Sequence, residues 1–155
     1  MTHNPFRNET GGRIDRNSPV GFEFNGRIYA GYDGDTLASA LLANGVFLTA
    51  RSFKYHRPRG IMAAGSEEPN ALIRLGKGAY AEPNLRATQI EIFEGLYAES
   101  QNRTPSLKFD IGAINSVLDR FFPAGFYYKT FMWPASMWMR YEHIIRHAAG
   151  LGKVA

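Results

Sequence analysis

The sequence predicts an α+β fold of the β-grasp type, in which one helix lies across a mixed sheet, followed by a helical, aromatic-rich C-terminal extension. Three observations predict it: an Asn25-Gly26 pair between two alternating runs, a short amphipathic segment at 36–44, and a new apolar run from Val46. The chain has 155 residues, of which 45% are hydrophobic and 21% charged, a composition typical of a folded domain.

The hairpin is the strongest local signal. Residues 20–24 and 27–32 alternate between apolar and polar side chains, and the Asn-Gly pair between them suits a type I′ turn, which needs positive φ at both central residues. Residues 1–18 are rich in Asn, Gly and Arg, so we expect a flexible arm there. We place the β-grasp domain at 19–100 and the extension at 101–155.

The helix and the later strands follow from capping and alternation. Asp35 is the predicted N-cap of the helix at 36–44, and Gly45 is the expected glycine that follows its end. Residues 51–70 are predicted to form a long, structured loop. Apolar or alternating runs predict four further strands, at 46–50, 71–75, 88–93 and 96–98.

The extension combines helical and aromatic signals. Asp110 is a suitable cap for a helix, and Pro134 suits the first turn of a last helix. Residues 121–141 hold nine aromatic side chains, which form either an internal core or a docking surface. We favour docking, because two or three short helices cannot bury nine rings. The aromatic candidates for this interface are Phe126, Tyr127, Phe131, Trp133 and Trp138.

Residues 51–60 form a basic loop with four fixed cations, one histidine, two aromatic residues and no acid. Such a loop could bind a phosphate, a flavin, a dinucleotide or single-stranded nucleic acid. Alternatively, it pairs with Glu67 and Glu68 or with a partner subunit, and we favour this structural role. Arg57 and Arg59 are therefore candidates for an interface, and a nucleic-acid or anion-binding module is an alternative. The net charge of +4 allows an acidic partner without requiring one.

No catalytic set and no metal site emerge from the sequence. Cysteine is absent, which excludes a thiolate nucleophile and any cysteine-ligated metal. His143 and His147 have helical spacing but lack a third ligand, so an exposed or partner-facing helix side is favoured. No apolar run reaches the length of a membrane span, and residues 1–19 lack the apolar segment of a signal peptide, so we expect a cytoplasmic protein without a membrane partner.

Three stretches, at 34–45, 51–71 and 122–134, resemble the N-terminal region of the alpha subunit of heterotetrameric sarcosine oxidase. The similarity extends from about Gly12 to Gly152. It implies a ferredoxin-like [2Fe–2S] β-grasp domain. Members of that wider family that bind a cluster carry a C-x4-C-x2-C run and a later cysteine.

The resemblance also locates the positions where cluster ligands would lie. It puts Ala63, Glu68 and Ala71 at the first three positions and Thr88 near the fourth, and none of them is cysteine. The resemblance therefore implies the fold while the cluster chemistry is missing, and we expect these to be vestigial positions in a chain that binds no cofactor.

The resemblance finally implies a role within a larger assembly. Sarcosine oxidases demethylate sarcosine oxidatively with FAD, FMN, NAD and tetrahydrofolate, and the chain stops at Ala155, before any dinucleotide-binding motif. We expect a non-catalytic docking domain, not an enzyme by itself. It would belong to an oxidoreductase that acts on CH–NH donors. Its partners would be the remaining alpha-subunit domains and the other subunits, with no nucleic acid; the alternative within this family is an electron-transfer domain.

Overall fold

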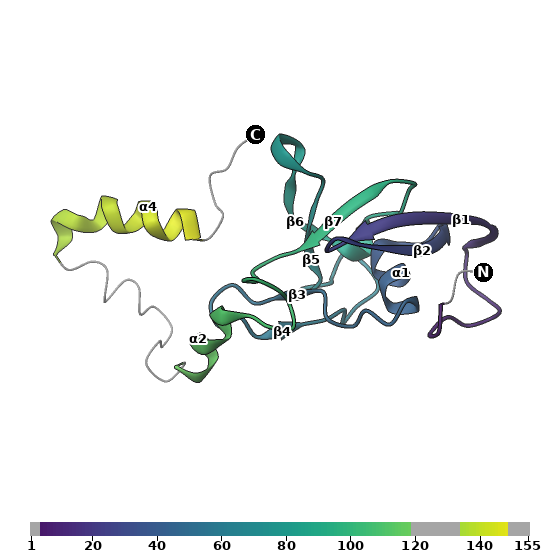
Figure 1. The fold of residues 1–155 in the computed structure, drawn as a ribbon, viewed down its shortest axis with the longest axis horizontal. Helices are drawn as coiled ribbons and strands as arrows, with labels where there is room; N and C mark the ends of the chain where they lie inside the picture. Colours follow the sequence, from purple (N-terminus) through teal and green to yellow (C-terminus); the bar gives the residue numbers. More distant parts are fainter. Residues whose placement is uncertain (1–3, 119–133, 149–155) are drawn as a thin grey trace.

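The computed structural model describes residues 4–118 and 134–148, with side chains as far as residue 144. A five-stranded mixed sheet with the order β2-β1-β7-β5-β6 forms its centre (Figure 1). The strands of this sheet are β1 (Asp15–Phe24), β2 (Arg27–Asp33), β5 (Leu72–Leu75), β6 (Glu82–Arg86) and β7 (Leu96–Ser100). A second sheet pairs β3 (Ala50–Arg51) with β4 (Pro58–Arg59).

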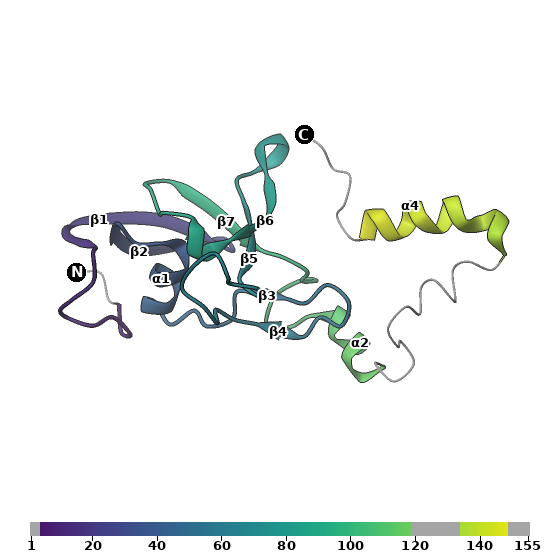
Figure 2. The same cartoon turned by 180° about the vertical axis from the view of Figure 1, so that it is seen from behind.

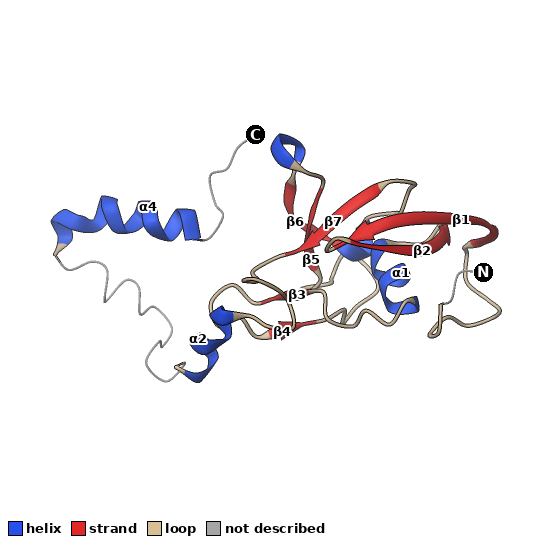
Figure 3. Cartoon of the chain, viewed as in Figure 1, coloured by secondary structure: helices blue, strands red, loops and turns tan. Residues whose placement is uncertain are grey.

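One helix, α1 (Leu37–Ala43), lies against the sheet, and the helices of the extension lie beyond it (Figures 2 and 3). Both views show α4 apart from the sheet. The helices that the structure describes in the extension are α2 (Ile114–Val117) and α4 (Trp138–Ala148). The described 3-10 turns are η1 (Gly78–Tyr80), η2 (Ala87–Gln89), η3 (Ile111–Ala113) and η5 (Ala135–Met137).

Strand pairing confirms the hairpin and the β-grasp topology. β1 and β2 are antiparallel, and Asn25 and Gly26 have φ values of 53° and 78°, as a type I′ turn requires. β1 also runs parallel to β7, with Phe22 opposite Leu96 and Phe24 opposite Ala98. The first and last strands are therefore neighbours within the sheet, and their buried side chains share one core cluster with those of α1.

The core lies between α1 and the sheet. Helix residues at apolar spacing and inward-facing strand residues make one cluster, in which burying a single large side chain is worth about 1.5–3 kcal/mol. Its largest members are Phe22, Phe24, Leu37, Leu41, Ile73, Ile92 and Leu96. The apolar side chains of the helix and those of the strands face the same interior. They therefore form one continuous apolar core.

The first turn of α1 corrects the predicted cap. The N-cap is Thr36, whose hydroxyl accepts a hydrogen bond from the Ser39 backbone N–H at 3.2 Å. Asp35 is buried instead, because its carboxylate forms a bidentate pair with Arg7 at 2.6 and 3.1 Å. Arg7 lies in the expected flexible arm, and β1 begins at Asp15, so part of residues 1–18 is held against the domain.

The strand predicted at 88–93 is wrong. Residues 87–89 form η2, and the backbone after it pairs with the start of α1: the Leu37 N–H donates to the Ile90 carbonyl at 2.7 Å, and the Ile92 N–H donates to the Asp35 carbonyl at 3.0 Å. The strand predicted at 46–50 shortens to β3, whereas those at 71–75 and 96–98 correspond to β5 and β7.

Candidate functional site

The basic loop at 51–60 folds around its first residue, Arg51, which is buried. Its Nε and Nη2 donate to the Leu107 carbonyl at 2.9 and 2.6 Å, and its Nη1 donates to the His56 carbonyl at 2.7 Å. The guanidinium also lies 3.4 Å from the Asp110 carboxylate. For Arg51, the acid partner is thus Asp110 and neither Glu67 nor Glu68.

Asp110 joins this loop to the extension. His56 Nδ1 lies 2.7 Å from its Oδ2, and the backbone N–H groups of Thr104 and Gly112 donate to its Oδ1 at 2.9 and 3.2 Å. Burial alone would raise the pKa of Asp110, but the hydrogen bonds from His56, Thr104 and Gly112 lower it overall. The carboxylate therefore stays ionised, and because it only accepts, His56 Nδ1 is the donor.

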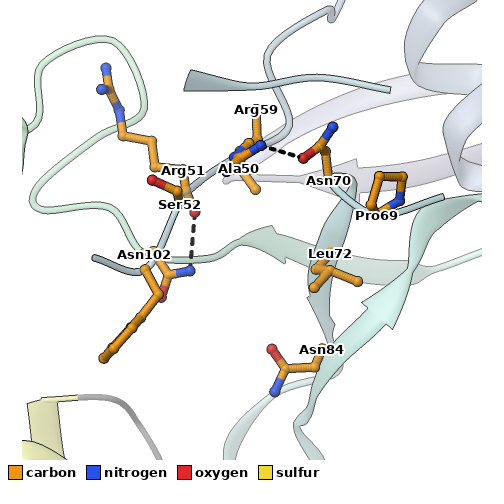
Figure 4. A pocket seen from close by; sticks show the side chains of 10 residues that line it. Ala50, Arg51, Ser52, Arg59, Pro69, Asn70, Leu72, Asn84 and Asn102 are labelled. Carbon is orange, nitrogen blue, oxygen red and sulfur yellow. Dashed lines mark hydrogen bonds between the residues drawn. The ribbon is translucent and has the colours of Figure 1, made fainter. Parts of the chain in front are cut away.

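The remaining arginines of the loop, Arg57 and Arg59, are exposed. The guanidinium of Arg57 lies 4.7 Å from the centre of the Tyr55 ring, and Arg59 Nη1 donates to Asn70 Oδ1 at 2.7 Å. Arg59 and Asn70 line an open hollow of about 400 Å³ (Figure 4). Amides and arginines dominate its polar lining, which has no pair of a nucleophile and a base.

Three of the four positions where the resemblance puts cluster ligands, namely Ala63, Ala71 and Glu68 itself, meet at the carboxylate of Glu68. Its Oε2 accepts hydrogen bonds from the backbone N–H groups of Met62 and Ala63, at 2.7 and 2.6 Å. Its Oε1 accepts from those of Asn70 and Ala71, at 2.7 and 3.0 Å. Burial alone would raise the pKa of Glu68, but these four backbone donors outweigh burial and hold that pKa below its ordinary value.

The fourth position is tied to the same loop. Thr88 is buried in η2, and its hydroxyl donates to the Gly65 carbonyl at 2.7 Å. Two alanines, one threonine and one buried carboxylate offer no thiolate, and thiolate is what [2Fe–2S] clusters require. The residues at these positions therefore do not fit an iron–sulfur cluster, and Glu68 fills the space between the loop's amides.

The extension presents apolar side chains that the sequence prediction did not place at an interface. Phe109, Ile111, Ile114 and Val117 are 71, 64, 58 and 79% exposed. The spacing after Asp110 predicted a helix, yet the apolar positions gave no sign of which side faces the domain. On the opposite side, Asn115 Nδ2 and Ser116 Oγ donate to the carbonyls of Lys54 and Tyr55, at 3.3 and 2.8 Å.

The aromatic interface candidates are only partly described. Phe126, Tyr127, Phe131 and Trp133 lie outside the described residues, and Trp138 is half-buried at the start of α4. His143 is exposed on α4. Within residues 4–118 and 134–148, no cluster of three or more His, Cys, Asp or Glu side chains could hold a metal ion. No helix in the same part of the chain is both long and apolar enough to span a membrane.

Comparisons with known proteins cover most of the chain. The sequence model of the 2Fe-2S iron-sulfur cluster binding domain matches residues 17–103. The sarcosine oxidase subunit alpha of Rhizobium meliloti (strain 1021) is 64% identical over 145 residues, which are 93% of this chain and 15% of that protein. The subunit alpha of Corynebacterium sp. (strain U-96) is 43% identical over 91 residues, 57% of this chain and 9% of that protein.

Among solved structures, the crystal structure of L-proline dehydrogenase from P. horikoshii has a TM-score of 0.47 and 24% identity, over 63% of this chain and 18% of that one. The chain spans less than a sixth of the length of either sarcosine oxidase subunit reported above.

Proposed function

Since this chain belongs to the 2Fe–2S iron–sulfur cluster binding domain family, in a form whose ligand positions carry no cysteine, we propose that it is a non-catalytic docking domain of a sarcosine-oxidase-like flavoprotein complex. The complex as a whole would oxidise sarcosine, with flavin, dinucleotide and folate bound by its other parts. The similarity to sarcosine oxidase alpha subunits supports this assignment.

One observation carries the docking role: the outward face of η3 and α2. Ile111, Ile114 and Val117 follow one another at intervals of three residues, so they share one side of the helical segment. Asn115 and Ser116 fix the opposite side to the basic loop. The segment is thus held in place by polar contacts while its apolar side faces away from the domain.

The occupant that we propose for this face is the rest of the alpha subunit. The relatives are several times longer than this chain, so a large partner surface is covalently adjacent in them. Arg57, Arg59, Phe126, Tyr127, Phe131, Trp133 and Trp138 belong to the same proposed interface. A nucleic-acid role for the basic loop has less support, because Arg51 is committed to Leu107, His56 and Asp110.

The docking role is tested with two variants that replace exposed isoleucines. The chain is mixed with the part of a relative's alpha subunit that lies outside the matched 145 residues, together with its companion subunits, and the dissociation constant is measured by calorimetry. Changing Ile111 and Ile114 together to serine should weaken binding about 100-fold or more, because burying each side chain is worth about 1.5–3 kcal/mol.

The matched control is Ile28→Ser, which removes an isoleucine that is 85% exposed on β2. Ile28 lies outside the proposed face, so this change should leave the dissociation constant within about twofold of the original. A twofold change is well below the roughly 1.4 kcal/mol that corresponds to a factor of ten. Failure of the original chain to bind, or equal binding by the double variant, would contradict the docking role.

The electron-transfer alternative is tested separately, by measuring the iron and sulfide content of the purified protein. Protein purified anaerobically should be colourless and should lack stoichiometric iron and sulfide, because Ala63, Glu68, Ala71 and Thr88 supply no thiolate. Metal and acid-labile sulfide assays, with the visible spectrum, check this prediction. Stoichiometric amounts of both elements would favour the electron-transfer alternative.

A further inference from the structure

The loop at 61–71 turns its backbone inward around one anion. Four N–H groups, two from each side of the loop, point at the Glu68 carboxylate at 2.6–3.0 Å, and the Glu68 side chain has no exposed surface. An ionised carboxylate has about four lone-pair positions. Four donors therefore satisfy it completely, and the two from Asn70 and Ala71 are themselves buried.

Such an arrangement is costly without its anion. Buried backbone N–H groups are almost always paired, and each unpaired donor carries the penalty of its lost hydration. Removal of the Glu68 charge would strand donors on both sides of the loop at once. Since the donors come from residues 62–63 and 70–71, the carboxylate also closes the loop upon itself.

Glu68 is the second of three residues that are spaced like the ligands of an iron–sulfur cluster. Ala63, Glu68 and Ala71 are separated by four and two residues, the spacing of three ligands in plant-type ferredoxins. Two of these three positions, Ala63 and Ala71, donate their N–H groups to the third. Hydrogen bonds to the sulfur atoms likewise surround iron–sulfur clusters, which with their thiolates are anionic.

We infer that the Glu68 carboxylate replaces the iron–sulfur cluster as the anion around which this loop folds. One side chain thereby supplies the negative charge and the hydrogen-bond acceptors that a cluster would supply, and the ferredoxin-like loop persists without metal. Two further contacts close the site: Arg86 Nε donates to the Glu68 carbonyl at 3.2 Å, and Thr88 Oγ1 donates to the Gly65 carbonyl at 2.7 Å.

The first test removes the charge while keeping the shape. Glu68→Gln puts an NH₂ group against N–H donors, so the thermal unfolding midpoint of the full chain should fall by about 5–10 °C. The matched control is Glu67→Gln, the neighbour whose carboxylate is exposed and accepts from the backbone N–H groups of Gly65, at 3.1 Å, and of Ala64 and Glu67. The control should shift the midpoint by less than about 2 °C. Equal midpoints for the two variants would overturn the inference.

The second test restores the chemistry that Glu68 is inferred to replace, and it holds even if Glu68→Gln does not fold. Ala63, Glu68, Ala71 and Thr88 are changed together to cysteine, and the chain is reconstituted anaerobically with ferric iron and sulfide. It should bind about two iron and two sulfide per chain and gain visible absorption.

The matched control for this test places the second cysteine at Glu67 and leaves Glu68 unchanged. The same mixture should then give no stoichiometric cluster, because the carboxylate still occupies the site. Binding by the control, or no binding by the variant with cysteine at position 68, would show that Glu68 does not stand at the cluster position.

Discussion

Replacing Arg51 with serine should lower the free energy of unfolding by about 3–5 kcal/mol, because it breaks a buried ion pair and strands its partners. The Asp110 carboxylate would lose a cation 3.4 Å away, and the Leu107 and His56 carbonyls would lose their donors. Urea unfolding followed by fluorescence measures the loss, and the m-value shows whether the unfolded state has changed.

Arg57→Ser is the matched control, since it removes the same side chain from the same loop at an exposed position. Its contact with the Tyr55 ring is worth about 0.5–1 kcal/mol at an exposed site, so the loss should stay within about 1 kcal/mol. Equal losses for Arg51→Ser and Arg57→Ser would mean that burial of Arg51 does not stabilise the loop.

The second large effect concerns the core. Leu41→Ala removes a side chain with no exposed surface from the inner side of α1, so stability should fall by about 2–5 kcal/mol. Leu42→Ala is the control: the next residue along the same helix is only half-buried, and its loss should be clearly smaller. Equal losses would mean that Leu41 contributes no more to the core than Leu42, against their difference in burial.

Much of the central fold could be predicted from local chemistry. The Asn25-Gly26 turn specified the hairpin, because few other dipeptides adopt positive φ at both positions. Helix α1 followed from its apolar spacing and from Gly45, which has a φ of 75°. These predictions are correct because the residues that determine a tight turn or a short helix are adjacent in the sequence.

The wrong strand and the missed strand have different causes. The alternation at 88–93 is consistent with the burial of Ile92, but alternation does not say whether the backbone pairs with a strand or with a helix end. β6 escaped prediction because Pro83 and its polar neighbours are untypical of a strand. It lies at the edge of the sheet, where a proline is tolerated.

The candidate site was predicted less well, because the residues that contact one another there are distant in the sequence. The composition of residues 51–60 predicted pairing with Glu67 and Glu68 or with a partner subunit, yet buried Arg51 pairs with Asp110, which lies 59 residues later in the sequence. Glu68 was located by its place in a ligand spacing. Nothing in the local sequence showed that its carboxylate would accept hydrogen bonds from four backbone N–H groups.

The parallel pairing of β1 with β7 has a mechanical consequence. β1 lies near the start of the chain and β7 leads into the extension, so a pull on the two ends draws these strands in opposite directions along their length. Hydrogen bonds pulled this way share the force and must break together, whereas an unzipping pull breaks them one by one. At the exit of β7, Ser100 N–H and Oγ also donate to Asn25 Oδ1, at 2.8 and 2.9 Å. Tension along the chain would therefore load the β1–β7 pairing at the centre of the sheet in shear.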